Sequence, residues 1–249
     1  MGEIDKRITI FHLLTHTSGI GDYIDEEAND SMEQLASLYH RYPSYLWERL
    51  EYYLQMITPL PPKFEPGSRF GYSNAGFVML GLAVEAVSGI PYQQFVTDEI
   101  IMPLKLCHTG FYRMDELPAN TALGYIGDKI RTNIFSMPVI GGSDGGLFTC
   151  VKDLDVRWRA MFSGQVLSDK MLELFLKSHV ERGDGKSYGL GVYRHEADKD
   201  IAYYAVGGDF GVNFFTAYFP KLKITASALG NTEIKIFPSL KSLLSEIVG

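Results

Sequence analysis

The chain has 249 residues, of which 46% are hydrophobic and 21% are charged, enough for one large hydrophobic core or two smaller ones. Its net charge of −7 is spread along the chain rather than gathered in blocks, which makes nucleic acid a poor partner. No run approaches the roughly 18 consecutive apolar residues of a membrane span, and the distant cysteines Cys107 and Cys150 indicate neither a disulfide framework nor a metal site.

A short helix is expected near the start of the chain. Thr9 is a suitable N-cap for residues 10–17, and Gly19 follows at a position where a left-handed residue commonly ends a helix. His12 and His16 lie four residues apart on this predicted helix, a spacing that can hold a metal, but no Glu follows His12 and no third ligand is evident. We therefore expect structural histidines and no metal.

Helical spacing continues in the following segments. Apolar and aromatic residues recur at this spacing between residues 25 and 56, with a break at Pro43. Residues 75–88 leave almost no polar face, which predicts a helix that is buried on most sides, and residues 92–101 predict another helix. An acidic run before these helices is interpreted as a solvated loop without a chemical role: Asp22, Asp25, Glu26 and Glu27.

The second half of the chain changes from helices to strands. An irregular stretch leads to the glycine cluster at residues 141–146, and Thr149 is a suitable N-cap for a helix over residues 152–162. A shorter helix is predicted over residues 170–177, and an amphipathic helix over residues 240–248. Between these two helices, β-branched and aromatic segments predict an antiparallel meander, with strands at 190–194, 201–206, 212–219 and 224–229.

The turn before the apolar helix carries two side chains suited to an active site. Tyr72 and Asn74 lie two positions apart, directly before residues 75–88. A phenol can transfer a proton, and a carboxamide can hold a substrate amide. Neither group is a nucleophile for acyl transfer, and the 249 residues contain no Ser-x-x-Lys motif. The turn therefore predicts only part of a site.

Several short motifs follow one another in a specific order: Ile10–Gly19, Tyr72-Ser73-Asn74, Pro103-Leu104, Gly145–Thr149, Tyr188–Gly191 and Gly207-Gly208. This ordered set resembles the serine β-lactamase-like family, whose members include class C β-lactamases, D-alanyl-D-alanine carboxypeptidases and related esterases. The resemblance covers nearly the whole chain. It is specific as a set, although each motif alone is short.

The resemblance implies an α+β fold of the β-lactamase/transpeptidase type, with an antiparallel sheet flanked by helices, a mainly helical region, and the site between them. It also implies an acyl-enzyme mechanism, in which the serine of a Ser-x-x-Lys motif attacks an amide or ester. Tyr72 matches the family's tyrosine, which assists proton transfer, and Asn74 matches the asparagine that orients the substrate. Gly207, Gly208 and Asp209 match the inner strand whose backbone completes the oxyanion hole.

Two departures from the family pattern bear on activity. The segment with the nucleophilic serine lies upstream of the first motif in the family, so we expect this chain to be the C-terminal part of a hydrolase that is inactive by itself. Val206 occupies the position of a basic or imidazole side chain, which disfavours substrates that carry a carboxylate, penicillins among them. These departures leave open an alternative, a non-catalytic member of the same fold that binds a ligand.

A further, less favoured alternative uses another serine. Residues 141–145 fit the Gly-x-Ser-x-Gly nucleophile elbow around Ser143, and His179 and His195 follow it in the order that an α/β-hydrolase needs. An elbow requires a strand before the serine and a helix directly after it, whereas the predicted strands come mostly later. We therefore expect a glycine-rich loop that borders the site.

These predictions divide the chain into two regions. Residues 1–180 are expected to form a mainly helical region that carries Tyr72 and Asn74, and residues 181–249 the strands and last helix of the α/β part. The expected partners are a small-molecule or peptide substrate and, through a sheet edge left uncovered, another copy of the chain. No cofactor or metal is implied, and the sequence does not indicate the cellular compartment.

Overall fold

The structure is a computed structural model that describes residues 4–27, 31–127, 131–234 and 236. It divides into two compact units. The first contains Met1–Pro103, Gly110–Pro118 and Phe135–Phe148. The second contains Leu104–Thr109, Ala119–Ile134 and Thr149–Gly249.

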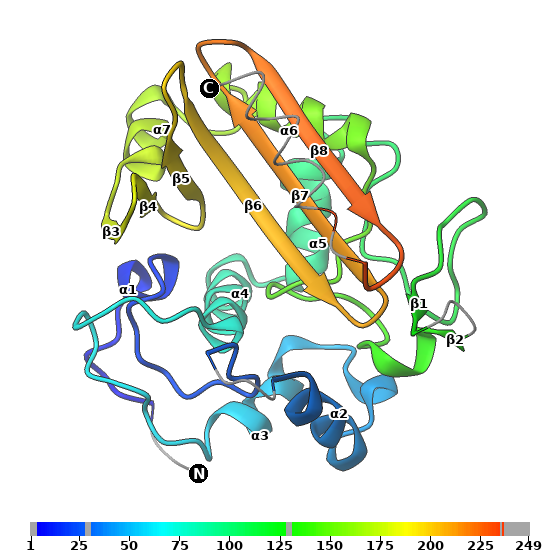
Figure 1. Cartoon of the computed structure of the whole chain (residues 1–249). Coiled ribbons are helices and arrows are strands. Elements are labelled where there is room, and N and C mark those ends of the chain that lie inside the picture. Colours follow the sequence, from blue (N-terminus) through cyan, green and yellow to red (C-terminus); the bar gives the residue numbers. More distant parts are fainter. Residues whose placement is uncertain (1–3, 28–30, 128–130, 235, 237–249) are drawn as a thin grey trace. The chain divides into compact units, whose positions relative to one another are not determined.

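The first unit is mainly helical (Figure 1). Its complete helices and helical turns are α1 (Ile10–Leu14), α2 (Ser31–Arg41), η1 (Ser44–Leu46), η2 (Leu50–Tyr53), α3 (Leu54–Ile57), α4 (Asn74–Ser88), α5 (Tyr92–Val96) and η3 (Thr97–Ile101). A further turn, η4 (Ile134–Ser136), crosses from the second unit into the first.

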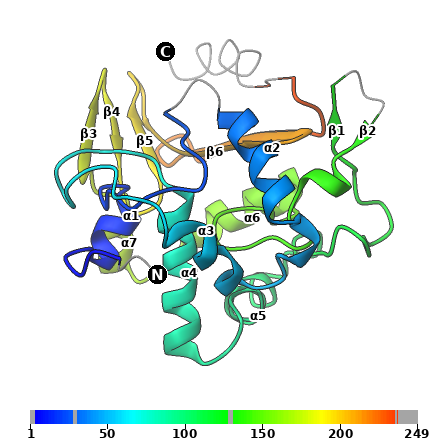
Figure 2. The same ribbon diagram turned by 90° about the horizontal axis from the view of Figure 1, so that it is seen from below.

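Helix α4 confirms the helix predicted over residues 75–88, and Gly89 ends it in the left-handed conformation with φ 75°. The π-helical η3 continues α5, so the helix predicted over residues 92–101 is also confirmed. Figure 2 shows α5 following the end of α4. No single helix of the described residues is long and apolar enough to cross a membrane; α4 and Tyr92–Ile101 have the required length and composition only as a pair, which is bent by 80°.

Two predictions about these helices are wrong. Helix α1 ends at Leu14 instead of near residue 17, because His16 takes a left-handed backbone conformation with φ 53°. Helix α4 is not buried on most sides: Val78 is 0% exposed, but Val87 is 91% exposed. The buried residues of α4 lie in its first half. An apolar sequence on all faces of a helix therefore does not mean that other parts of the protein bury the helix along its whole length.

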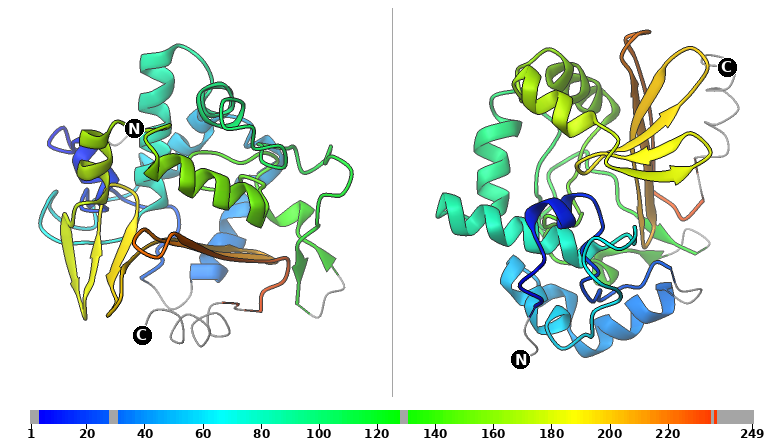
Figure 3. Two further views of the ribbon diagram at one scale, coloured as in Figure 1. Left: turned by 90° about the horizontal axis from the view of Figure 1, so that it is seen from above. Right: turned by 90° about the vertical axis from the view of Figure 1, so that its left-hand side faces the viewer.

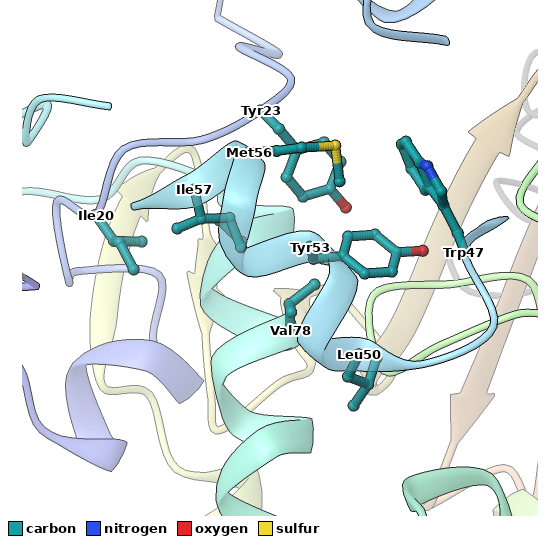
Figure 4. Packing of buried hydrophobic residues seen from close by; sticks show 9 residues of the cluster. Ile20, Tyr23, Trp47, Leu50, Tyr53, Met56, Ile57 and Val78 are labelled. Carbon is teal, nitrogen blue, oxygen red and sulfur yellow. The ribbon is translucent and has the colours of Figure 1, made fainter. Parts of the chain in front are cut away.

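The core of the first unit is rich in aromatic side chains (Figure 4). Trp47 and Tyr53 pack edge to face with ring centroids 5.0 Å apart, and Tyr23 lies 5.6 Å from Tyr53 in a similar arrangement. Val78 brings α4 into this cluster. Burying a large apolar side chain contributes about 1.5–3 kcal/mol, so the cluster holds α4 firmly by its first half.

The second unit is built on an antiparallel sheet in which each strand pairs with the next one along the chain, as the predicted meander requires. The strands are β3 (Val180–Gly183), β4 (Lys186–Tyr188), β5 (Tyr193–Glu196), β6 (Ile201–Asp209), β7 (Val212–Phe219) and β8 (Ile224–Gly230). A separate hairpin joins β1 (Tyr125–Ile126) to β2 (Arg131–Thr132). The expected α+β class is confirmed.

The observed strands differ in detail from the predicted ones. The segment predicted over residues 190–194 pairs only from Tyr193 onward, as β5. Strands β3 and β4 were not predicted, because they are short, charged and joined through left-handed turn residues at 183–185. Strand β6 continues past residue 206 to Asp209 and so includes the two glycines.

Helix α6 (Val151–Phe162) covers one face of the sheet, as Figure 3 shows, and α7 (Asp169–Leu176) follows it. Trp158 of α6 is 1% exposed, and its indole N–H donates to Thr216 Oγ1 of β7 at 2.9 Å. Cys150, not Thr149, is the N-cap of α6, since the Thr149 hydroxyl is hydrogen bonded to that of Thr109 at 2.8 Å.

The compact units do not follow the expected regions 1–180 and 181–249. Helices α6 and α7 belong to the unit that contains the strands, although the sequence groups them with the helical region. The helix predicted over residues 240–248 lies outside the described residues.

Candidate active site

Tyr72 and Asn74 flank the residue that caps α4. Ser73 has an extended backbone (φ −148°, ψ 116°), and its Oγ accepts the backbone N–H of Gly76 at 3.0 Å. The Ser73 residue is buried, with 3% exposure. A cap of this kind is typically worth about 1 kcal/mol. It fixes the direction in which Tyr72 leads into the helix and Asn74 begins it.

A carboxylate, Asp22, contacts the start of α4. Both of its oxygens accept the backbone N–H of Ala75, each at 3.3 Å. Burial raises the pKa of Asp22 to about 6, although hydrogen bonds from the Ser73 side chain and from backbone N–H groups act in the opposite direction. The interpretation of Asp22 as part of a solvated loop is therefore wrong.

A second acidic residue of the same run holds Asn74. Its Nδ2 donates to Glu26 Oε1 at 2.8 Å, which leaves Asn74 Oδ1 as the acceptor on the other side of the carboxamide. The neighbouring Asp25 instead pairs with Lys63 at 2.7 Å. Sequence reasoning missed Glu26 because nothing in an acidic run indicates a bond to a residue 48 positions later.

Tyr72 is partly buried, and its ring lies against the imidazole of His16 with the centroids 4.3 Å apart. His16 is 1% exposed, and its Nδ1 accepts the backbone N–H of Ser73 at 3.1 Å. His12 does not contact this turn through its Nδ1, which instead accepts the backbone N–H of Thr9 in the capping box of α1. Across the described part of the chain, no three His, Cys, Asp or Glu side chains form a group suited to a metal.

The predicted oxyanion segment, Gly207–Asp209, forms the end of β6 in the second unit. Along this segment, β6 pairs with β7 in antiparallel register: Gly207 with Phe214, Gly208 with Asn213 and Asp209 with Val212. On the other side of β6, pairing with β5 stops at Tyr204, so no described strand borders the backbone of residues 205–209 there.

The two glycines of this segment differ in their surroundings. A Cβ at Gly207 would lie 2.4 Å from the ring of Phe214, whereas the nearest atom to a Cβ at Gly208 is 3.8 Å away. Gly207 therefore allows close packing within the sheet. Val206 is 44% exposed and presents an apolar surface at the position where the resemblance implies a cation.

The glycine-rich loop at residues 141–146 does not have the geometry of a nucleophile elbow. Ser143 Oγ is buried against α4, so closely that a Cβ at Gly81 would lie 2.2 Å from it. The chain then forms a bridge at Phe148, and the next helix begins only at Val151. An elbow requires that helix directly after the serine.

The same loop is attached to the core of the first unit. The hydroxyl of Tyr23 donates to the carboxylate of Asp144. Burial raises the pKa of Asp144 to about 6, and it also raises the pKa of Tyr23 well above its usual range. The contact therefore ties a glycine-rich loop to a buried tyrosine.

The first unit thus brings Tyr72 and Asn74 together with residues that sequence reasoning did not select for chemistry: His16, Asp22 and Glu26. Gly207–Asp209 belong to the other unit.

Comparison with known proteins identifies a family for the chain. The model of the Beta-lactamase family matches residues 2–240. The solved structure of a penicillin binding protein from Bacillus halodurans is 37% identical, with a TM-score of 0.91 over 96% of this chain and 74% of that chain.

Curated relatives are more distant and longer. "Putative penicillin-binding protein PbpX" of Bacillus subtilis (strain 168) is 29% identical over 190 residues, which are 76% of this chain and 43% of that protein. "Putative D-alanyl-D-alanine carboxypeptidase" of Escherichia coli (strain K12) is 31% identical over an alignment of 166 residues, and the match covers 55% of this chain and 38% of that protein. The matched part of the chain therefore covers less than half the length of these relatives.

Proposed function

The chain belongs to the beta-lactamase family of serine hydrolases, and we propose that it supplies the tyrosine and asparagine of an acyl-transfer site. The observation that carries this proposal is the fixed start of α4. Ser73 caps the helix, and Tyr72 and Asn74 are held on either side of it by His16 and Glu26. Substrate groups are best handled by side chains whose geometry is already set before binding.

In the proposed reaction a serine attacks the carbonyl of an amide or ester and forms an acyl-enzyme, which water then hydrolyses. The Tyr72 phenol passes the proton between the nucleophile and the leaving group. Asn74 orients the acyl side of the substrate. The serine comes from a Ser-x-x-Lys motif, which is not among these 249 residues, so we expect no acyl-enzyme from this chain alone.

The second unit has a separate proposed role. The backbone of Gly207–Asp209 supplies N–H donors to the oxyanion, a function that requires no particular side chain. Val206 gives this strand no cation to pair with a carboxylate. We therefore favour uncharged amides or esters over penicillins as substrates.

The test is an acylation assay in which covalent adducts are detected by mass spectrometry of the intact protein. The chain alone, and a form of the protein that includes a Ser-x-x-Lys segment, are incubated with a fluorescent penicillin and with an activated ester. We expect an adduct only on the longer form, faster with the ester, and Tyr72→Phe should slow it by about 10²–10⁴-fold. A stoichiometric adduct on Ser143 of this chain would contradict the proposal.

A non-catalytic, ligand-binding member of the family is the second candidate. Val206 and the absence of Ser-x-x-Lys from this sequence favour it. Saturable binding of a peptide ligand without any covalent adduct on the longer form would support this candidate over a hydrolase.

Self-association is a further part of the proposal. Strand β8 is the last strand in the described sheet, and its seven residues include no charge and no proline to discourage pairing with another strand. Leu229→Lys places a charge on this strand and should shift the chain toward monomer in light scattering. Leu222→Lys, at a similar exposure just before the strand, is the control.

A further inference from the structure

We propose that His16 is a positioning residue for the site, holding both the ring of Tyr72 and the backbone that leads into Asn74. The effect of His16 on catalysis rests on the proposed function. The contacts of His16 are independent of that function, because they join segments 57 residues apart within the first unit whatever reaction occurs.

The backbone of His16 has an unusual conformation that brings its carbonyl to the turn before α4. Helix α1 stops at Leu14, and His16 then takes φ 53°, a left-handed conformation that non-glycine residues adopt at a cost of about 1 kcal/mol or more. This conformation allows the His16 carbonyl to accept the backbone N–H of Gly71 at 2.9 Å. The residue just before Tyr72 is thereby fixed.

The imidazole fixes the residue just after Tyr72. His16 Nδ1 accepts the Ser73 N–H at 3.1 Å in a site where His16 is 1% exposed. Nδ1 must therefore carry no proton, because a protonated Nδ1 has no lone pair to accept this bond. Loss of the acceptor would leave the N–H of a buried residue without this partner.

The ring of His16 also contacts the side chains around the turn. Its centroid lies 4.3 Å from that of Tyr72, at an angle of 39°, and 4.9 Å from that of Phe77 in α4. Phe70 meets it edge to face at 5.7 Å. Aromatic pairs contribute about 0.5–1.5 kcal/mol each beyond their buried area. A rotation of the Tyr72 ring away from His16 would therefore lose a favourable contact.

Two variants separate the functions of this side chain. His16→Asn keeps an acceptor near the position of Nδ1 and tolerates the left-handed backbone, but it removes the ring. His16→Phe keeps a ring but removes the acceptor. Thr15→Val is the matched control: Thr15 is 0% exposed in the same segment, and its hydroxyl bonds to Phe11 O and the Thr17 hydroxyl rather than to residues 70–77.

The first measurement is NMR on this chain. His16→Phe should speed exchange of the Ser73 amide about tenfold, while His16→Asn should keep its protection but change the Tyr72 ring shifts. Thr15→Val should change neither. If Thr15→Val moves both signals as much, or if the Asn and Phe variants give the same pattern, His16 is only a core residue and the proposal is wrong.

The second measurement is the acylation rate in the serine-bearing form. Each His16 variant should lower the acylation rate about tenfold when Tyr72 is present and far less in a Tyr72→Phe background, because His16 affects the rate through the position of Tyr72. Equal effects in the two backgrounds would contradict a positioning role. If Tyr72→Phe itself leaves the rate unchanged, the proposed function fails, while the NMR result for His16 still decides the structural coupling.

Discussion

The start of α4 and the end of β6 hold their candidate site residues by different means. At α4, side chains set the geometry: Ser73 caps the helix, and Asp22, Glu26 and His16 reach it from the segment after α1. At β6, backbone pairing with β7 sets the geometry, and the residues of interest are largely glycine.

This difference indicates where each region is sensitive to mutation. A region held by side chains responds to pH and to the loss of a single hydrogen bond. A region held by strand pairing tolerates changes of side chain but not a side chain where backbone and ring lie close together. Four measurements test this difference between the two regions.

The largest expected effect is the pH dependence that Asp22 gives to the first region. Its pKa in the folded chain is raised to about 6 from the ordinary 3.8, so folding favours the protonated carboxyl. The resulting stability is fully present below about pH 4 and is lost as the pH rises through about 6. We expect a loss of roughly 2 kcal/mol, with allowance for the partial exposure of Asp22.

Asp22→Asn should remove this part of the slope in urea unfolding measured between pH 4 and pH 7. Asp144, whose pKa is also raised to about 6, contributes a second part that Asp144→Asn removes. The carboxyl of Asp25 has a lowered pKa and affects stability only at more acidic pH. If the free energy of unfolding of Asp22→Asn depends on pH as strongly as that of the unchanged chain, the carboxyl of Asp22 does not have a raised pKa in the folded protein.

Gly207→Ala tests the second region. The new Cβ would lie 2.4 Å from the ring of Phe214, so the ring must move, and we expect the free energy of unfolding to fall by about 1–2 kcal/mol. Gly208→Ala, where the nearest atom is 3.8 Å away, is the matched control and should stay within about 0.5 kcal/mol. Equal losses at both positions would point to backbone conformation instead of packing.

Ser73→Ala should cost about 1 kcal/mol through the lost cap. The loss should appear as faster amide exchange in the first turn of α4, because the Gly76 N–H loses its acceptor. Ser168→Ala makes the same change at the cap of α7 in the second unit and should leave exchange in α4 unchanged. If exchange in α4 does not respond to Ser73→Ala, the helix start is held by packing alone.

Glu26→Ala should have the smallest effect on stability, within about 0.5 kcal/mol, because its bond to Asn74 is exposed. The Asn74 side-chain NH₂ signals should nevertheless shift, since their acceptor is gone. Glu33→Ala, at the start of α2, should leave those signals unchanged. Stationary Asn74 signals in Glu26→Ala would show that the carboxamide is oriented by other groups.

Much of the local structure could be predicted. The apolar run and Gly89 were sufficient for α4, and β-branched and aromatic segments were sufficient for most of the meander. The predictions failed where a distant contact decided the outcome: Thr149 bonds to Thr109 instead of capping α6. Strands β3 and β4 were missed because pairing, rather than composition, makes them strands.

Neighbouring residues alone were sufficient to predict the family, the α+β class and the selection of Tyr72 and Asn74, because ordered motifs, caps and apolar periodicity are local properties of a chain. The contacts that hold Tyr72 and Asn74 arise from the tertiary fold. His16, Asp22 and Glu26 reach residues 73–75 across 48 to 57 positions of chain. A histidine and an acidic run have no local preference for such partners, so their roles follow from burial and hydrogen bonding in the folded first unit.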